Sequence, residues 1–526
     1  MSHLKPSIHN LQSTERVDQL ECAQSYESRC RKYVPFCYCL STSKTFSELR
    51  AHQYTIPHNA PIHVLDDDSL LNIFLLYRPA LLDGDEDVND YIILGRNWRR
   101  ERWWYKLAHV CRGWRYLILG NSSHLGLYLL FTHDTPVADM LAHSPPLPLI
   151  IDHFDHGIWA HDRRGITLAL LHRDRVRRVR LTGHSPFVNW LMGAMDYEFP
   201  MLEYLCITLK DNAALKLPMT FQAPQLRHLV LANLTPSMGS PLLTGATGLV
   251  TLSLQCVHSS AYFRPSELLQ QVSLMPHLET LRIEFHPSVS RREFEHELSH
   301  MPNNTHVTLP HLRSFGFGGI SPYLEAFLSQ IIAPRLEAFH IVFFDQLTLS
   351  ISCLLQFMIA SKNLRLRRAL LLFDGEGVKL WVYPLETPES IAFALRIYSR
   401  RPISTAARMF SAFNPGLSSV ADLTLEYEGY RSWTGWQNEA TRNEWRTLLR
   451  SLDNVKTLHI ADNLVGELSD SLRFNGGELP INLLPELKKL SYSASTNRDN
   501  SFAEFINARQ GTGCPVALVY HLKRTT

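Results

Sequence analysis

Short apolar pieces with a common spacing recur along the chain from about residue 168. Their form is Pro-x-Leu-x-x-Leu-x-apolar, with Phe at the second leucine position in two cases, and the six complete pieces begin at Pro200, Pro224, Pro276, Pro310, Pro334 and Pro485. The spacing predicts a turn that buries the first leucine, then a short strand whose alternate side chains face inward. Between two pieces, residues 265–274 (PSELLQQVSL) predict a helix.

The intervals between pieces indicate how each repeat is built. Leu202, Leu226, Leu249 and Leu278 follow one another at 24, 23 and 29 residues. Each interval accommodates one strand and one helix, as in stacked repeats. The predicted fold class is therefore α/β, with residues 121–526 forming an irregular solenoid of a strand plus a helix per repeat and ending in a C-terminal cap. The pattern is weakest between residues 355 and 450.

Two helices are predicted ahead of the repeats. The first lies within residues 61–78, where three Asp and a Ser can cap the free N–H groups and the apolar stripe consists of Leu70, Leu71, Phe74 and Leu75. The second spans residues 104–118, and its apolar face consists of Leu107, Val110, Cys111, Trp114 and Leu117. We expect the two helices to pack together, with residues 79–103 as an insertion between them.

Composition restricts the class of protein. Hydrophobic residues make up 45% and charged residues 19% of the 526 positions, as in an ordinary globular protein. The formal net charge of +2 predicts no long-range attraction to nucleic acid or to an anionic membrane. Nine cysteines without regular pairing favour a reducing compartment, cytoplasmic or nuclear. Residues 1–60 are polar and are predicted to be unstructured, and no apolar run predicts a membrane span.

Candidate chemistry is sparse. The densest group of potential metal ligands is His153, Asp155, His156, His161 and Asp162, which lacks an HExxH motif and is interpreted as a solvated loop. Residues 373–377 (FDGEG) predict a turn rather than a phosphate loop. Arginines between residues 173 and 180 alternate with Val176 and Val179, which predicts a strand with one wet face rather than a nucleic-acid site. No enzyme, no metal and no cofactor is expected.

Residues 61–120 resemble an F-box, a module that joins a substrate adaptor to a cullin-RING ubiquitin ligase. The resemblance rests on Pro61-Ile62-x-x-Leu65-x-Asp67-Asp68-x-Leu70-Leu71-x-Ile73-Phe74 and Leu107-Ala108-x-Val110-Cys111-x-x-Trp114-Arg115. Asp66 stands where the family usually has Pro, and the spacer between the halves is longer than in a minimal F-box. The whole chain is similar to fungal F-box proteins with degenerate leucine-rich repeats.

The resemblance implies a substrate-recognition adaptor of an SCF-type cullin-RING ligase, which would bind a Skp-type linker subunit, through it a cullin, and an unknown protein substrate. The candidate linker-binding residues are Ile62, Leu65, Leu70, Leu71, Phe74, Leu107, Val110, Cys111 and Trp114. The candidate substrate-binding residues, on outward strand positions, are Glu203, Arg227, Glu279, Arg313 and Glu337. Two alternatives stay open: a leucine-rich-repeat scaffold without a ligase role, and apolar residues that hold the F-box itself together.

Overall fold

The computed structural model describes residues 65–77, 103–132, 136–154, 163–211, 213, 215–287, 306–344, 351–361, 366–384, 391–428, 439–473, 482–494 and 501–522. The chain divides into two compact units. Unit 1 comprises Met1–Tyr128 and Pro136–Leu147, and unit 2 comprises Leu129–Thr135 and Pro148–Thr526. The predicted unstructured segment 1–60, Ile62 and most of the predicted insertion lie outside the described residues.

Unit 1 is helical where it is described. Its helices are α2 (Asp67–Tyr77), α4 (Trp103–Ala108), α5 (Arg112–Gly120) and α6 (Val137–His143). As predicted, an aspartate begins the first helix, because Asp66 Oδ1 accepts a hydrogen bond from the Ser69 N–H at 2.6 Å. This hydrogen bond lowers the pKa of Asp66.

The prediction of one continuous helix over residues 104–118 is wrong. The chain leaves the helix after Ala108, and Cys111 is extended (φ −156°) as the N-cap of α5. The Cys111 thiol accepts a hydrogen bond from the Trp114 N–H at 3.4 Å, which replaces a missing backbone partner at the start of α5. Leu107, Val110 and Trp114 therefore do not lie along a single helix face.

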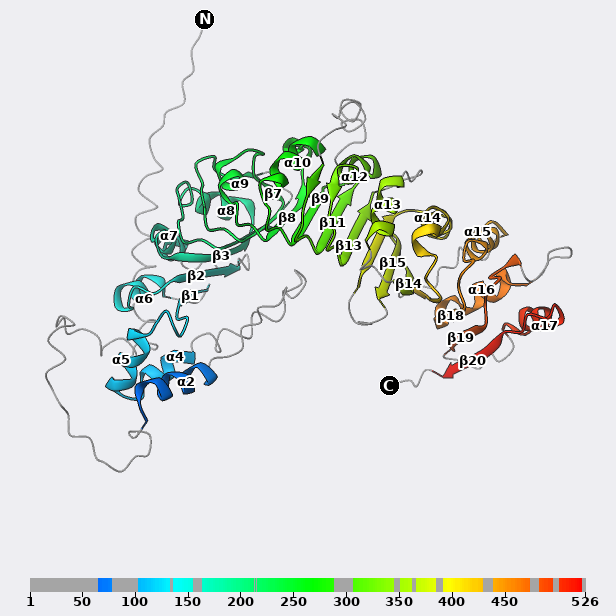
Figure 1. Cartoon of the computed structure of the whole chain (residues 1–526), viewed down its shortest axis with the longest axis horizontal. Coiled ribbons are helices and arrows are strands. Elements are labelled where there is room, and N and C mark those ends of the chain that lie inside the picture. The colour runs from blue at the N-terminus through cyan, green and yellow to red at the C-terminus, as the bar shows by residue number, and fades with distance from the viewer. Residues whose placement is uncertain are drawn as a thin grey trace, which may run out of the picture. The chain divides into compact units, whose positions relative to one another are not determined.

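Unit 2 is built on a sixteen-stranded sheet in the order β1-β2-β3-β4-β6-β8-β9-β11-β13-β16-β15-β14-β17-β18-β19-β20 (Figure 1). The strands are β1 (Leu129–Phe131), β2 (Leu149–Phe154), β3 (Val176–Gly183), β4 (Tyr204–Leu209), β6 (His228–Ala232), β8 (Thr251–Val257), β9 (Thr280–Phe285), β11 (Ser314–Gly319), β13 (Ala338–Phe343), β14 (Leu366–Phe373), β15 (Gly377–Pro384), β16 (Phe393–Tyr398), β17 (Asp422–Tyr427), β18 (Thr457–Ile460), β19 (Lys489–Ala494) and β20 (Ala517–Leu522). Two small parallel pairs join β5 (Leu215–Lys216) to β7 (Leu234–Thr235) and β10 (Val307–Thr308) to β12 (Ile331–Ile332).

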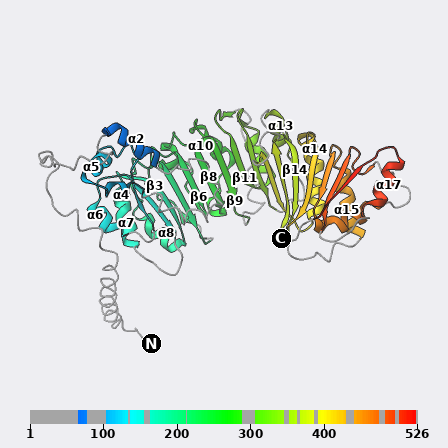
Figure 2. The ribbon, with the colours of Figure 1, turned by 90° about the horizontal axis from the view of Figure 1, so that it is seen from below.

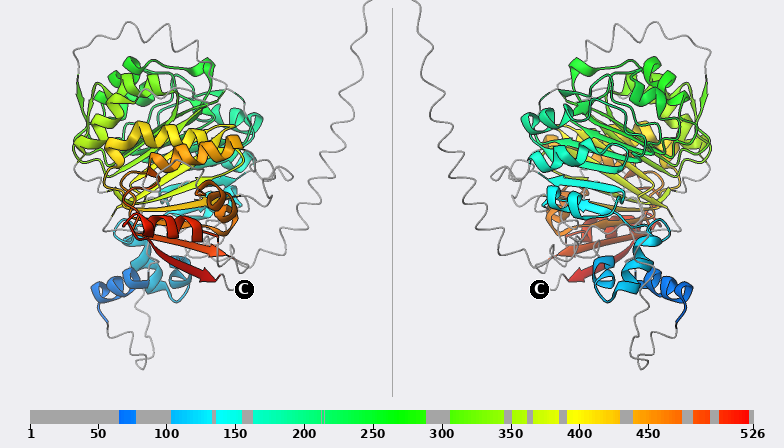
Figure 3. Two further views of the ribbon diagram at one scale, coloured as in Figure 1. Left: turned by 90° about the vertical axis from the view of Figure 1, so that its right-hand side faces the viewer. Right: turned by 90° about the vertical axis from the view of Figure 1, so that its left-hand side faces the viewer.

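Helices separate many of the consecutive strands. They are α7 (Arg163–Leu171), α8 (Ser185–Met192), α9 (Pro241–Gly245), α10 (Pro265–Ser273), α12 (Ser321–Leu328), α13 (Ser352–Ala360), α14 (Pro402–Leu417), α15 (Glu439–Arg450), α16 (Val465–Ser471) and α17 (Ala503–Gly511), with short 3-10 turns at Ser259–Ala261 and Asp462–Leu464. The helix predicted over 265–274 is α10. Figure 2 shows the strands side by side in one continuous sheet. Helices α14 and α15 pack against each other, as Figure 3 shows.

The recurring leucines stack in columns across the sheet. Leu205 pairs in register with Leu229, Leu229 with Leu252, and Leu252 with Leu281, and all four are buried. The preceding leucines, such as Leu202, are buried as well. The predicted strands therefore lie at the predicted positions, because equivalent positions of parallel strands meet side by side and share one core.

The region where the pattern weakens contains a local reversal of strand direction. β15 lies between β14 and β16 and is antiparallel to both, whereas β14 and β16 are each parallel to their outer neighbours. The predicted turn at 373–377 connects β14 to β15. Gly377 permits the close approach of β16, because a Cβ on this residue would overlap the carbonyl oxygen of Ile397.

Candidate functional site

The predicted linker-binding residues of unit 1 separate into buried and exposed sets. Leu70, Leu71 and Phe74 are buried, and the Phe74 ring meets the Trp114 ring edge-on with centroids 4.9 Å apart. Trp114 itself is half-buried, as is Leu107. These residues hold α2 against α5, because aromatic and aliphatic side chains removed from water in this way provide most of a small unit's stability.

A second apolar stripe of α2 faces solvent. Ile73, Leu76 and Tyr77 are 44%, 87% and 53% exposed, and they lie at i, i+3 and i+4 of the helix. We call these three residues the α2 apolar face. They were not among the sequence candidates, although one signal was present: α2 is apolar nearly all round, and such a helix needs a partner on more than one side.

Two of the sequence candidates join the exposed set. Leu65, which precedes α2, and Val110, at the break between α4 and α5, are 40% and 59% exposed. Tyr116 on α5 is a further exposed aromatic residue. Cys111 is exposed too, but its sulfur is engaged in capping α5. Unit 1 thus presents several apolar side chains to solvent around a core that is already packed.

The predicted substrate-binding residues lie just before β4, β6, β9, β11 and β13, and Val250 holds the equivalent place before β8. Backbone hydrogen bonds of 2.7–2.8 Å link all six in one row, in which the N–H of each residue from Arg227 onward donates to the carbonyl of the residue before it in the row. Their charges alternate along the row, and Arg313 Nη1 lies 3.9 Å from Glu337 Oε1. Such exposed pairs contribute at most about 1 kcal/mol. The row therefore carries little net charge with which to attract a partner.

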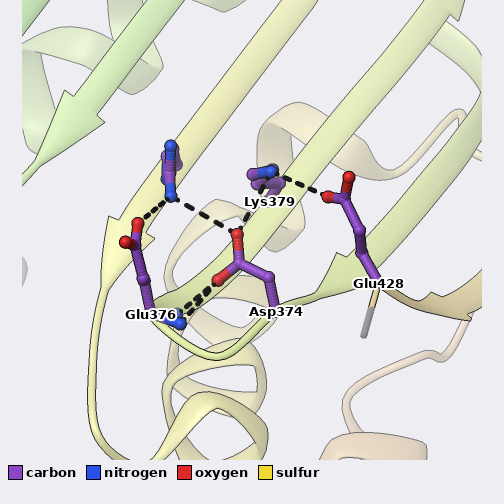
Figure 4. A network of polar contacts seen from close by, with 6 residues as sticks. Asp374, Glu376, Lys379 and Glu428 are labelled. Atoms are coloured by element: carbon purple, nitrogen blue, oxygen red, sulfur yellow. Dashed lines mark hydrogen bonds and ion pairs between the residues drawn. The ribbon is translucent and has the colours of Figure 1, made fainter. Parts of the chain in front are cut away.

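A connected cluster of polar side chains surrounds the β14–β15 turn (Figure 4). Asp374 is buried and accepts hydrogen bonds from the Glu376 and Gly377 N–H groups at 2.9 and 2.7 Å. Its other oxygen lies 3.1 Å from Lys379 Nζ and 3.4 Å from Arg396 Nη2. Burial acts to raise the pKa of Asp374, but the Glu376 N–H, Lys379 and Arg396 outweigh it and lower the pKa.

This cluster connects the reversed strand β15 to its neighbours. Lys379 also pairs with Glu428 at 3.0 Å, and Arg396 pairs with Glu376 at 2.6 Å. Two cations thus face three carboxylates, so the charges of the cluster are largely balanced. Both cations stand on neighbouring strands, which the buried Asp374 holds in register.

His153 occupies a different environment from the one predicted. The prediction of a solvated loop is wrong for this residue, which is buried in β2 with its ring centroid 4.9 Å from that of Phe187. His153 takes an inward position in the alternation of β2 that also buries Leu149 and Ile151. The other members of the cluster, Asp155, His156, His161 and Asp162, lie outside the described residues. Where the structure is described, no three His, Cys, Asp or Glu side chains gather as metal ligands do.

No helix in the described ranges combines the length and the apolar composition needed to cross a bilayer. No protein-family model matches the chain, and a comparison with curated proteins gave no match.

Proposed function

We propose that this protein is the substrate-recognition adaptor of an SCF-type cullin-RING ubiquitin ligase. In this proposal unit 1 is the F-box, which docks a Skp-type linker subunit. Unit 2 is an irregular leucine-rich-repeat solenoid, which presents a protein substrate. The protein has no catalytic role of its own, and it works in the cytoplasm or the nucleus.

The observation that carries the proposal is the α2 apolar face. Leu76 is 87% exposed although Leu70, Leu71 and Phe74 already form the core beside it. A large aliphatic side chain is costly to leave in water, at about 1.5–3 kcal/mol for full exposure, so a contiguous exposed stripe favours a protein partner. Ile73 and Tyr77 extend the stripe along the helix and suit a groove that accepts i, i+3 and i+4 anchors.

The organisation of unit 2 supports the repeat half of the proposal. From β1 to β13 each strand of the large sheet lies beside the strand that precedes it in the sheet along the chain, and the columns through Leu205 and Ile207 continue from strand to strand. A solenoid would have this nearest-neighbour arrangement, which supports the proposal. The antiparallel β15 is a local irregularity within it.

The test uses the full chain and a purified Skp-type linker subunit. We expect Leu76→Asp to reduce capture of the linker subunit at least about tenfold, because an aspartate in an apolar groove loses its hydration without a partner. The matched control is Ile359→Asp, an exposed aliphatic residue (62%) on α13 of unit 2, which should leave capture unchanged. Circular dichroism establishes that each variant is folded.

Two results would contradict the proposal. One is failure of the wild-type chain to retain the linker subunit. The other is equal capture by wild type and the Leu76→Asp variant. In either case a repeat scaffold that binds a protein partner without a ligase would become the better account of unit 2.

A further inference from the structure

Strand β3 places two arginines on the side of the sheet opposite α8. Arg178 and Arg180 occupy alternate positions of the strand, so their side chains share one face. The other face carries Leu181, whose register partner His153 packs against Phe187 of α8. Arg178 is exposed and Arg180 is half-buried. Both guanidinium groups therefore lie on the face that α8 does not cover.

Aromatic rings on neighbouring strands hold the cations of this face. The guanidinium carbon of Arg178 lies 4.2 Å from the ring centroid of Tyr204, its register partner on β4. Lys210 Nζ, just beyond β4, lies 4.3 Å from the Phe154 ring centroid. Stacking on the Tyr204 ring positions the Arg178 guanidinium without neutralising its charge.

Strand β14 offers a comparison within the same sheet. It begins Leu366-Arg367-Arg368-Ala369, as β3 begins Val176-Arg177-Arg178-Val179. Buried and exposed positions follow one another in the same order along the two strands. On β14 a carboxylate stands opposite the arginines, since Arg368 pairs in register with Asp422 and Arg367 Nε lies 4.0 Å from Asp422 Oδ2.

On β3 the corresponding neighbours on the β4 side are uncharged, whereas on the β2 side Ile150 stands beside Arg178 and Asp152 beside Arg180. Tyr204 stands beside Arg178, and Cys206 stands beside Arg180. Among the residues that the structure describes, no carboxylate lies within ion-pair distance of Arg178 or Arg180. The third arginine, Arg177, does pair, with Glu203 at 2.8 Å. The positive charge of Arg178 and Arg180 thus remains available.

We infer that Arg178, Arg180 and Tyr204 bind an extended acidic segment of a protein partner. Side chains two residues apart on a strand are about 6.6–6.8 Å apart, and carboxylates at alternate positions of an extended peptide have the same spacing. An Asp/Glu-x-Asp/Glu sequence running along β3 would therefore place one carboxylate on each guanidinium. That this partner is the ligase substrate rests on the proposed function, whereas the binding itself does not.

The size of the cluster favours an acidic peptide over a nucleic acid. Arg178 and Arg180 offer two cations, few beside the roughly 6–10 phosphate contacts that give strong DNA binding. Asp152 lies next to Arg180 in register, on β2, and lowers the net positive charge of this part of the face further. So small a net charge suits a short peptide with two carboxylates better than a long phosphate backbone.

The probe is a short fluorescein-labelled peptide with the core Glu-Ser-Glu-Ser-Glu, titrated with the full chain at low ionic strength and followed by fluorescence anisotropy. Wild type should bind it, and Arg178→Glu with Arg180→Glu should weaken binding by about tenfold or more. The matched control, Arg367→Glu with Arg368→Glu on β14, should change the dissociation constant by less than about twofold. Arg178→Gln with Arg180→Gln is a milder pair in case charge reversal disturbs the fold.

Three results would overturn the inference: no binding to wild type, equal weakening by the β3 and β14 pairs, or tighter binding of a single-stranded oligonucleotide at Arg178 and Arg180. A peptide of the same composition with its glutamates contiguous should bind more weakly than the alternating one. The assay contains no linker subunit, so its failure is distinguishable from failure of the proposed function, which loss of linker capture would reveal.

Discussion

We expect stability near α16 to depend on pH because of one partly buried carboxyl. Glu467 lies on α16, which packs against α15, and its Oε2 atom has no hydrogen-bond partner among the described residues. Burial raises the pKa of Glu467 from 4.5 to about 7, and the neighbouring Trp445 indole opposes only part of that rise. We expect Glu467→Gln to stabilise this part of unit 2 at alkaline pH.

The magnitude follows from linkage between protonation and folding. The folded pKa of about 7 exceeds the unfolded value of 4.5, so the folded state binds the proton more tightly and stability falls as pH rises between these values. At 1.36 kcal/mol per pKa unit, a rise of this size means that ionised Glu467 lowers the free energy of unfolding by at most about 3.4 kcal/mol. Because the carboxyl keeps partial contact with water, we expect about 1–2 kcal/mol.

Hydrogen exchange of the α15 and α16 amides, measured by mass spectrometry, reports the free energy of local opening. At pH 8 the free energy of local opening should be about 1–2 kcal/mol higher in Glu467→Gln than in wild type. The difference should vanish near pH 5, where both side chains are neutral in the folded state. Glu439→Gln, an exposed glutamate on α15, is the control and should show no such pH dependence. A difference between wild type and Glu467→Gln that is the same at both pH values would refute the reasoning.

Two further predictions concern the reversed strand β15. Gly377→Ala should destabilise unit 2 by about 1–3 kcal/mol because the new methyl group overlaps the Ile397 carbonyl oxygen. The control Gly375→Ala, with open space around it, should cost under about 0.5 kcal/mol. Urea denaturation measures both, and equal midpoints for the two variants would contradict the geometry. Asp374→Asn should cost about 1–3 kcal/mol at pH 7, since Lys379 and Arg396 lose a buried partner. The folded pKa of Asp374 is lowered, so its contribution is present above the unfolded value of 3.8 and is lost as pH falls through the folded pKa. A penalty that persists unchanged in acid would show that the charge of Asp374 is not its cause.

Local signals in the sequence were sufficient for several elements of unit 2. The Pro-x-Leu-x-x-Leu-x-apolar spacing located strands such as β4, β6 and β9. The alternation of apolar residues after the second leucine is typical of a short strand with one buried face. The turn at 373–377 and the cap at Asp66 were likewise predictable, because glycine, aspartate and serine act on backbone groups only a few residues away.

Periodicity cannot decide between two apolar stripes on the same helix. Both Leu70 with Phe74 and Ile73 with Leu76 have helical spacing, and only the packing of Trp114 on Phe74 settles which stripe is buried. The break at Cys111 also escaped prediction, since the apolar spacing continues across it.

The sequence alone therefore determined where the strands with the repeat spacing, the turn at 373–377 and the start of α2 lie, whereas the tertiary structure decided which side chains meet. Arg178 and Tyr204 are 26 residues apart and become neighbours only through the register of β3 and β4. The same arginine pair on β14 meets Asp422 instead. Similar local sequences thus acquire different charge environments, because a strand's neighbours come from distant parts of the chain, and no short-range pattern encodes them.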